Sequence, residues 1–186
     1  MVRLAKNKLM QSLVFICLVA VGLLGIVNAL VDPKVFAAVQ FEEQAAFKEV
    51  MPLAANFTAI KSSGDKKVLY YKAFDLQGKL IGFVFKANGQ GYSSVIETLA
   101  GIFPDGRISA IKIISLDETL GLGMRVTEDK FTGQFNQQNS LDLSGVQAIT
   151  GASISSRAVM NSVMQKAQEI KELINTDKID KKEGAE

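Results

Sequence analysis

Ala148-Ile-Thr-Gly-Ala-Ser-Ile-Ser-Ser-Arg157 is the stretch around which the rest of the chain is organised. It brings four hydroxyl side chains close together, and its Gly-Ala pair keeps bulk away from the backbone, so that a planar or phosphorylated ligand can approach. The apolar residues that follow recur at helical spacing, and they are Val159, Val163, Ala167, Ile170 and Ile174. The hydroxyl cluster is therefore predicted to lie at the N-terminus of a long amphipathic helix.

A helix N-terminus of this kind favours an anionic ligand. Its first N–H groups have no acceptor within the helix, and the helix dipole adds partial positive charge, so a phosphate group is stabilised there. Arg157 adds a cationic side chain that can bind the same group. The alternative is that Ser153 or Ser155 only caps the helix, because serine is a preferred N-cap residue. The local sequence leaves both interpretations open.

Four strands arranged as two β-hairpins are predicted upstream of this stretch. Segments rich in β-branched and aromatic residues alternate there with turn residues, and they are 68–74, 80–86, 95–103 and 108–116. Asp75-Leu-Gln-Gly78 joins the first pair, and Pro104-Asp-Gly106 joins the second. Two hairpins predict a mostly antiparallel sheet, and together with the long C-terminal helix they place the chain in the α+β class.

Loops and one short helix are predicted around these strands. Asn88-Gly-Gln-Gly91 is expected to end the second strand, because glycines permit a turn or a close backbone approach. Residues 127–135 are expected to form a short helix that Thr127 caps, with Phe131 and Phe135 on one face. A polar loop then leads into the central stretch.

The N-terminal part of the chain is typical of a membrane anchor. Residues 9–31 contain no charged side chain. At about 1.5 Å per residue this span measures roughly 34 Å, enough to cross a hydrocarbon core of about 30 Å. Basic residues precede the span, so the positive-inside rule places residues 1–8 in the cytoplasm and residues from 32 onward outside. The alternative is a cleavable signal peptide, with Val27-Asn-Ala29 as a weak cleavage site.

Three further segments are expected after the anchor. Asp32-Pro33 signals a helix start and Pro52 a helix stop, so residues 35–51 are predicted to form a stalk helix that continues the anchor and packs on the domain. This helix belongs to a stalk or linker segment at residues 32–60. Residues 61–175 are expected to form the compact domain. Residues 176–186 alternate charges with few apolar side chains, which predicts a charged, flexible tail.

The composition excludes several classes of site. The chain has no His and no Trp, and its one Cys is Cys17, inside the predicted anchor. The domain beyond the anchor therefore cannot build a Ser-His-Asp triad, a cysteine zinc or iron–sulfur site, a disulfide or a His-ligated haem. Redox chemistry in this domain would require an organic cofactor. The acidic and basic residues nearly balance after the anchor, without a basic patch interleaved with aromatics, which argues against a nucleic-acid partner.

Three motifs, in order along the chain, carry a resemblance to a known family. Thr150-Gly-Ala-Ser153, continued by Ile-Ser-Ser-Arg-Ala-Val, resembles the (Ser/Thr)-Gly-Ala-Thr flavinylation motif. This motif is found in FMN-binding subunits of Rnf-type electron-transport complexes and of Na⁺-translocating NADH:quinone reductases. Asp117-Glu-Thr-Leu-Gly-Leu-Gly123 is similar to the Glu-Thr-Pro-Gly-Leu-Gly signature of the Rnf G subunit, and Gly89-Gln-Gly-Tyr92 to a Gly-x-Gly-aromatic element that precedes it.

The chain departs from the family pattern at three positions. Ser153 replaces the usual Thr, Gln147 replaces the usual Asp, and Leu120 replaces the common Pro. Serine keeps a hydroxyl, so an ester remains chemically feasible at Ser153. Loss of proline removes some loop rigidity at Leu120.

The resemblance implies an FMN that is attached covalently to Ser153 through a phosphoester, which a flavin transferase installs. The other residues that the resemblance assigns to the cofactor are Thr150, Gly151, Ala152, Ile154, Ser155, Gly91, Tyr92, Glu118, Thr119, Gly121, Leu122 and Gly123. Ser155 and Ser156 are expected to cap the helix and so to leave Ser153 free. The implied protein lies in a bacterial cytoplasmic membrane with its domain on the outer side. It relays electrons between neighbouring subunits, and it has no catalytic activity alone.

Other functions fit parts of the same pattern. The corresponding C subunit of a Na⁺-translocating quinone reductase is the nearest, although that resemblance implies a longer chain. An anchored module that binds FMN reversibly, with Ser153 as a cap, is another. Asp117 and Glu118 form a carboxylate pair, but without His nearby a structural loop is favoured over acid–base catalysis. A hydrolase is the weakest alternative, because its hydroxyl nucleophile would lack an activating His.

Overall fold

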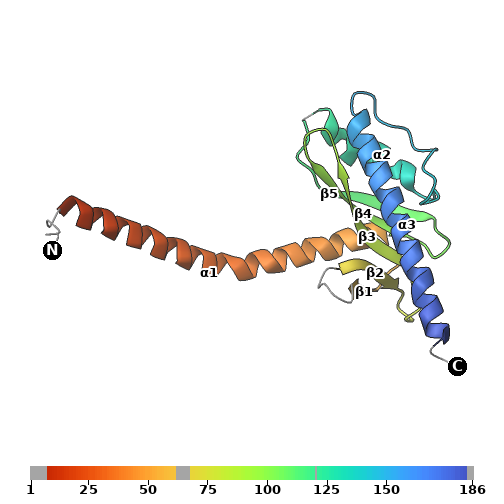
Figure 1. Cartoon of the computed structure of the whole chain (residues 1–186), viewed down its shortest axis with the longest axis horizontal. Helices are drawn as coiled ribbons and strands as arrows, with labels where there is room; N and C mark the ends of the chain where they lie inside the picture. Colours follow the sequence, from red (N-terminus) through yellow and green to blue (C-terminus); the bar gives the residue numbers. More distant parts are fainter. Residues whose placement is uncertain (1–7, 62–67, 120, 184–186) are drawn as a thin grey trace. The chain divides into compact units, whose positions relative to one another are not determined.

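The computed structural model describes residues 8–61, 68–119 and 121–183, with side-chain surroundings at 11–25, 44–61, 68–119 and 121–175. The chain divides into two units between Gln44 and Ala45. Its α-helices and strands are labelled in Figure 1. In chain order the elements are α1 (Lys8–Val50), β1 (Asn56–Lys61), β2 (Val68–Phe74), β3 (Leu80–Gln90), β4 (Val95–Ile102), β5 (Ile108–Ser115), the 3₁₀ helix η1 (Gly123–Thr127), α2 (Asp129–Thr132), the 3₁₀ helix η2 (Gly133–Phe135) and α3 (Ser153–Glu183).

The first unit is helical, and α1 runs through it without a break. Asp32 and Pro33 lie inside this helix, so the helix start that was predicted there is wrong. The predicted stop is confirmed, because α1 ends at Val50, just before Pro52. The side chains of residues 11–25 are exposed. Those of 9, 10 and 26–31, the rest of the predicted anchor, lie outside the described residues.

No helix within the described part of the chain combines the length and the apolar character needed to cross a membrane.

The second unit is built on a five-stranded antiparallel sheet of order β1-β2-β3-β4-β5. The four predicted strands are confirmed, and β2 has the predicted bounds. Strand β1 was predicted as linker. Its side chains are mostly exposed, as expected of an edge strand, so its sequence lacks the apolar signal of a buried one.

Strand β3 is longer than predicted. Asn88, Gly89 and Gln90 pair in register with β4, so the predicted break at Asn88-Gly-Gln-Gly91 is wrong. Tertiary packing explains the glycine at position 89. A Cβ at Gly89 would collide with the backbone carbonyl of Ala158, so the missing side chain lets α3 approach β3 closely.

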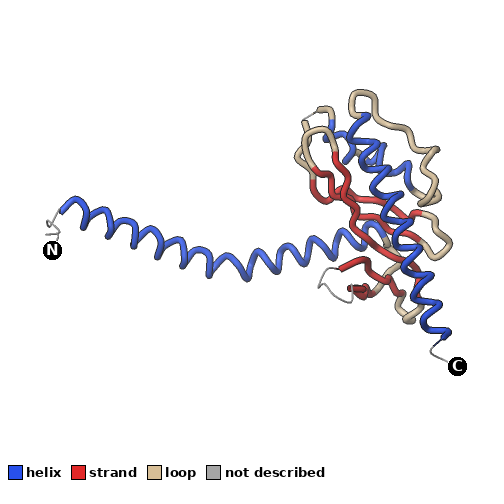
Figure 2. Tube along the Cα trace, viewed as in Figure 1, coloured by secondary structure: helices blue, strands red, loops and turns tan. Residues whose placement is uncertain are grey.

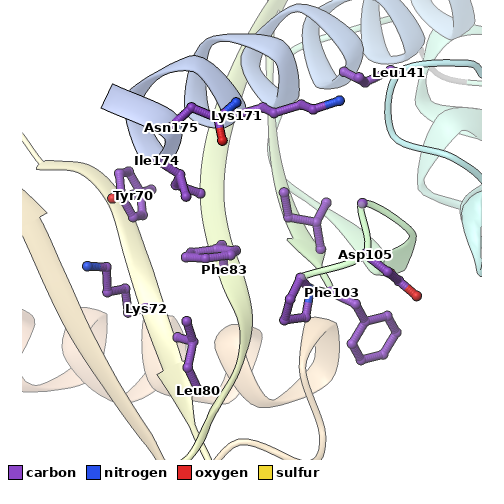
Figure 3. A pocket seen from close by; sticks show the side chains of 13 residues that line it. Tyr70, Lys72, Leu80, Phe83, Phe103, Asp105, Leu141, Lys171, Ile174 and Asn175 are labelled. Carbon is purple, nitrogen blue, oxygen red and sulfur yellow. The ribbon is translucent and has the colours of Figure 1, made fainter. Parts of the chain in front are cut away.

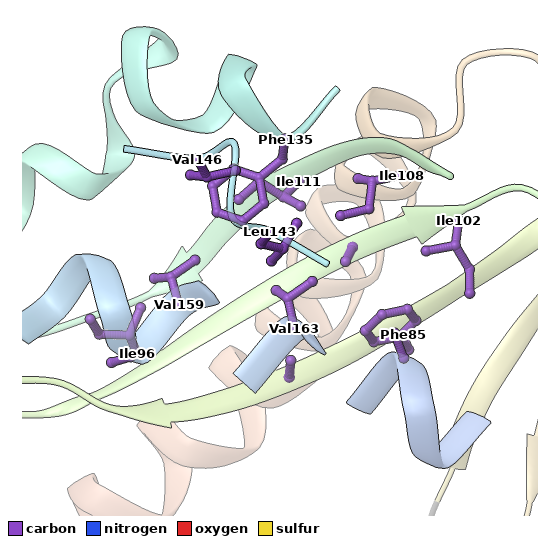
Figure 4. Packing of buried hydrophobic residues seen from close by; sticks show 14 of the residues in the cluster. Phe85, Ile96, Ile102, Ile108, Ile111, Phe135, Leu143, Val146, Val159 and Val163 are labelled. Carbon is purple, nitrogen blue, oxygen red and sulfur yellow. The ribbon is translucent and has the colours of Figure 1, made fainter. Parts of the chain in front are cut away.

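Each face of the sheet has its own core. Helix α3 packs on one face, with apolar side chains such as Phe85 and Ile96 meeting Val159 and Val163 (Figure 4). The opposite face packs against the end of α1 and the residue after it, where Phe47, Val50 and Met51 cluster with Val84 and Leu99. Alternation of neighbouring residues along β3, as in Val84 and Phe85, supplies both cores. Figure 2 shows α3 lying against the sheet.

The segment between β5 and α3 completes the α3 side of the core. Phe131 and Phe135 are buried, and their rings meet edge to face with centroids 5.3 Å apart, which confirms the predicted shared face. Thr127 does not cap this helix, because it ends η1 and donates its hydroxyl hydrogen bond back to Met124 O. Glu128 is the N-cap of α2, without a side-chain cap bond. At the other end, α3 continues to Glu183, beyond the predicted start of the tail at residue 176.

Candidate functional site

The three motifs meet at one groove. Its volume is about 530 Å³, and its lining residues are Tyr92, Glu118, Thr119, Leu122, Gly123, Gly151, Ala152, Ser153, Ile154 and Ser155. All of them were predicted as site residues. The groove lies within the size range of small-molecule sites, about 300–1,000 Å³. Gly91, Gly121 and Thr150 complete the predicted set and adjoin the groove in sequence without lining it.

Ser153 is the first residue of α3, and its side chain is exposed. Its hydroxyl has no hydrogen-bond partner among the described residues, so it is not engaged as an N-cap. Ser155 and Ser156 differ, because both are buried and hydrogen-bonded. The expectation that they cap the helix is wrong, since they lie inside its first turn. The expectation that they leave Ser153 free is consistent with this geometry.

Ser156 ties the helix to the turn before it. Its hydroxyl donates to Ala152 O at 2.9 Å and accepts from Ile149 N at 3.1 Å. Ala152 N donates to Ile149 O at 2.9 Å and closes the turn. Gly151 has φ +85° within it, a left-handed conformation that residues with a side chain rarely adopt. The motif therefore has a fixed backbone that presents Ser153 at its end.

The loop after β5 reaches this turn through its own glycine and leucine. Gly121 has φ +77°, so it also requires the left-handed region. A Cβ at Gly151 would lie 3.3 Å from Leu122 Cδ2, so the two motifs are in contact. Leu120 lies outside the described residues.

Glu118 is the buried centre of the site. Its side chain is 6% exposed. Oε1 accepts hydrogen bonds from Ser93 N and Ser94 N, each at 3.0 Å, and Oε2 accepts one from the Ser155 hydroxyl at 2.9 Å. Burial alone raises the pKa of the Glu118 carboxyl, but the hydrogen bonds from Ser94, Ser93 and Ser155 outweigh it and bring the pKa below its ordinary value. The carboxylate is therefore held in its charged form.

Two motif glycines make room for this carboxylate. A Cβ at Gly91 would collide with Glu118 Oε1, and a Cβ at Gly123 would collide with Oε2. The sequence suggested that these glycines admit a flavin, but in the structure their missing side chains face Glu118. Both residues are buried, which agrees with packing against a side chain and not with lining an open surface.

Arg125 is a neighbour of the site that sequence reasoning missed. Its Nη1 donates to Thr150 O at 3.4 Å, and its Nε pairs with Glu128 Oε1 at 3.1 Å. The one signal for it was a cation two residues after the Gly-Leu-Gly motif. Gln147 is exposed and is tied through its backbone, since its N–H donates to Gln134 Oε1 at 2.8 Å.

The match to known proteins agrees with this geometry. Residues 91–168 match the protein family described as FMN-binding domain. Over 169 residues the chain is 34% identical to the G subunit of the ion-translocating oxidoreductase complex of Methanosarcina acetivorans, covering 84% of this chain and 90% of that protein. The chain belongs to the family of these G subunits.

Other members of the family are also similar. The G subunit of the Na⁺-translocating ferredoxin:NAD⁺ oxidoreductase complex of Acetobacterium woodii is 31% identical over 147 residues, covering 66% of this chain and 71% of that protein. The predicted resemblance to the Rnf G subunit is thereby confirmed. The crystal structure of NqrC from Shewanella oneidensis aligns with a TM-score of 0.48 at 22% identity, over 62% of this chain and 66% of that one.

The groove suits FMN, the cofactor for which the domain is named. Large apolar side chains stand exposed around it: Tyr92 is 71% exposed, Ile154 56% and Leu122 49%. A planar aromatic ring system would bury such surface, whereas water leaves it unfavourably hydrated. The N-terminus of α3 and the Ser153 hydroxyl, which has no hydrogen-bond partner among the described residues, would suit the phosphate group. Among the described residues, no group of three metal-ligating side chains could hold a metal ion instead.

A second cavity lies away from the motifs. Its volume is about 340 Å³, and Figure 3 shows Phe83 of β3 together with Tyr70, Ile174 and Lys171 around it. Most of its lining residues are apolar. However, it shares no residue with the flavinylation motif or with the loop at 117–123. Its lining from α3 begins at Lys171, several turns after Ser153. The motif groove is therefore the candidate cofactor site.

Proposed function

We propose that this chain is a membrane-anchored subunit of an Rnf-type complex that carries one FMN covalently on Ser153 and relays electrons between neighbouring subunits. One observation carries the proposal. Ser153 presents an exposed hydroxyl without a partner among the described residues, at the start of α3, whereas Ser155 and Ser156 are buried and hydrogen-bonded. Thr150 is exposed as well, but it precedes α3 and does not line the groove, so Ser153 is the exposed motif hydroxyl that lies both in the groove and at the helix N-terminus.

Attachment makes Ser153 Oγ the nucleophile. Its oxygen attacks the phosphorus of an activated FMN donor, a phosphoanhydride such as a flavin dinucleotide. The Oγ–P bond forms, the anhydride P–O bond breaks, and a nucleoside monophosphate leaves. The hydroxyl proton passes to a base of the flavin transferase, because no carboxylate or other base among the described residues hydrogen-bonds the Ser153 hydroxyl. The N–H groups at the start of α3 stabilise the negative charge of the phosphodiester.

Electron transfer depends on positioning by this chain. FMN supplies the redox chemistry, because its ring system accepts and donates electrons singly or in pairs. Tyr92, Leu122 and Ile154 provide apolar contact area at the groove. The buried Glu118 carboxylate places a fixed negative charge in the lining. The redox partners are other subunits of the complex.

A membrane anchor at residues 9–31 is part of the proposal. Support comes from the exposed apolar side chains of α1, among them Leu13, Phe15, Ile16 and Leu24, which are more than half exposed. A helix that exposes apolar side chains over such a length requires an apolar environment. With basic residues before the span, residues 1–8 lie in the cytoplasm and the flavin domain, 61–175, lies on the outer side.

Fluorescence of the protein in a denaturing gel tests covalent attachment. The full chain is produced with a flavin transferase and run beside its Ser153→Ala variant. A fluorescent band for the natural chain and none for Ser153→Ala are expected, since only a covalent flavin survives denaturation. A dark band for the natural chain, with flavin released on denaturation, would replace this proposal with reversible FMN binding.

A further inference from the structure

Glu118 joins three segments that are far apart in the sequence. Its Oε1 binds the backbone of the turn at Ser93 and Ser94, which directly follows Tyr92. Its Oε2 binds Ser155 in the first turn of α3, two residues after Ser153. The backbone before Glu118 adds a further link, because Asp117 N donates to Ser94 Oγ at 2.9 Å. The residues that flank the groove are thus connected through one carboxylate.

The surroundings of Glu118 argue against a role in proton transfer. It is buried, and both of its oxygens accept hydrogen bonds from fixed donors. The glycines that adjoin it, Gly91 and Gly123, leave space for these oxygens but none for a side chain of their own. A carboxylate enclosed in this way is suited to holding its neighbours in place.

We propose that Glu118 is the positioning residue of the flavin groove. By fixing the turn at Ser93 and Ser94 and the first turn of α3, it sets Tyr92 and Ser153 in the arrangement that flavin attachment requires. The predicted effect of Glu118 on flavin attachment rests on the proposed attachment to Ser153. The predicted effect of Glu118 on the order of the groove does not, and it can be tested without flavin.

Substitutions at Glu118 distinguish the effect of its negative charge from the effect of its hydrogen bonds. Glu118→Gln keeps an oxygen that can accept from Ser93 N and Ser94 N, and its amide can donate to Ser155 Oγ, so the links are retained without the charge. Glu118→Ala removes every link. Glu118→Asp keeps the charge but withdraws the carboxylate by one methylene, so that it cannot serve both sides. Asp117→Ala is the matched control, because that exposed side chain makes no hydrogen bond or ion pair within the described residues.

The first measurement is amide hydrogen exchange at Ser93 and Ser94 in the flavin-free full chain. Protection is expected to fall at least tenfold in Glu118→Ala and Glu118→Asp, and to stay near the natural level in Glu118→Gln and Asp117→Ala.

The amide proton chemical shifts of Ser93 and Ser94 should also change with pH as Glu118 titrates in the natural chain, and they should stay constant in Glu118→Gln. Unchanged protection in both Glu118→Ala and Glu118→Asp would overturn the proposal. Circular dichroism shows which variants fold, and Glu118→Asp decides the question if Glu118→Ala does not.

The second measurement is the extent of flavin loading on the same variants by the transferase. Loading is expected to fall severalfold in Glu118→Ala and Glu118→Asp, and to be largely restored in Glu118→Gln. Lost amide protection with normal loading would show that Glu118 orders the loop without preparing Ser153, which would overturn the proposal. If the natural chain is not loaded at all, attachment to Ser153 fails, whereas amide exchange still decides whether Glu118 orders the groove.

Discussion

The hydroxyl of Ser155 donates a hydrogen bond of 2.9 Å to Oε2 of Glu118, and both side chains are buried. This bond joins the start of α3 to the loop after β5, across 37 residues of sequence. The flavinylation motif and the glycine-rich loop are therefore parts of one packed unit. A substitution in either segment should therefore alter the structure of the other.

The stability of the domain should depend on pH through Glu118. Its pKa in the folded chain lies below the ordinary value, so the ionised carboxylate favours folding. That contribution is fully present above the ordinary pKa of about 4.3 and is lost as the pH falls through the folded-state pKa. Urea unfolding of the natural chain and Glu118→Gln should therefore show a stability difference that shrinks as the pH is lowered below about 4. A difference that is constant with pH would show that the charge has no such role.

Substitutions at three glycines should rank by their surroundings. Gly123→Ala should be the most damaging, because its Cβ would meet the Glu118 Cβ at 2.8 Å and displace the carboxylate. Gly121→Ala has open space but φ +77°, so it should cost about 1–2 kcal/mol of folding free energy. Gly133→Ala, with φ −65° and open space, is the control and should be nearly neutral. Thermal unfolding and flavin loading measure the ranking, and equal effects at Gly123 and Gly133 would contradict it.

Thr98→Val should stabilise the domain. The Thr98 hydroxyl on β4 is fully buried and has no hydrogen-bond partner among the described residues. An apolar side chain of the same shape removes the cost of burying it, a gain of about 1 kcal/mol or more. Ser162→Ala is the opposite case, because the Ser162 hydroxyl donates to Val159 O at 3.0 Å and its loss should cost about 1 kcal/mol. Urea unfolding should give the two variants opposite signs; a destabilised Thr98→Val would mean that its hydroxyl has a partner.

The orientation of the anchor can be read with reporter fusions. Basic residues precede the span at 9–31, so a reporter fused after Glu186 should be active only if it functions outside the cytoplasm. The mature protein should still contain the peptide that precedes residue 9. An N-terminus near Asp32 would show instead that the span is a cleaved signal peptide.

Local patterns predicted most of the fold. Strand β2 follows from its β-forming residues and the turn signal after it, and the paired rings of Phe131 and Phe135 follow from helical spacing. Strand β1 could not be found this way, because it is an edge strand that depends on pairing with β2. The extension of β3 through Gly89 was missed since glycine looks like a turn residue, although here it serves the packing of α3.

The sequence predicted which residues form the site, but not how these residues contact one another. The motifs indicated which residues surround the groove, including Ser153 and Tyr92. They could not show that Gly91 and Gly123 face Glu118, because burial of this carboxylate arises only when loops separated by many residues close together. Hydrogen bonds between distant segments leave no periodic signal in the sequence.

The central claim is that Ser153, and no neighbouring hydroxyl, carries FMN. Peptide mapping by mass spectrometry after production with a flavin transferase tests it most directly. The peptide that contains Ser153 should gain the mass of FMN less one water, with fragment ions that place the adduct on Ser153. The adduct should persist in Ser153→Thr, which keeps a hydroxyl, and vanish in Ser153→Ala. An unmodified chain, or an adduct on Thr150 or Ser155, would contradict the claim.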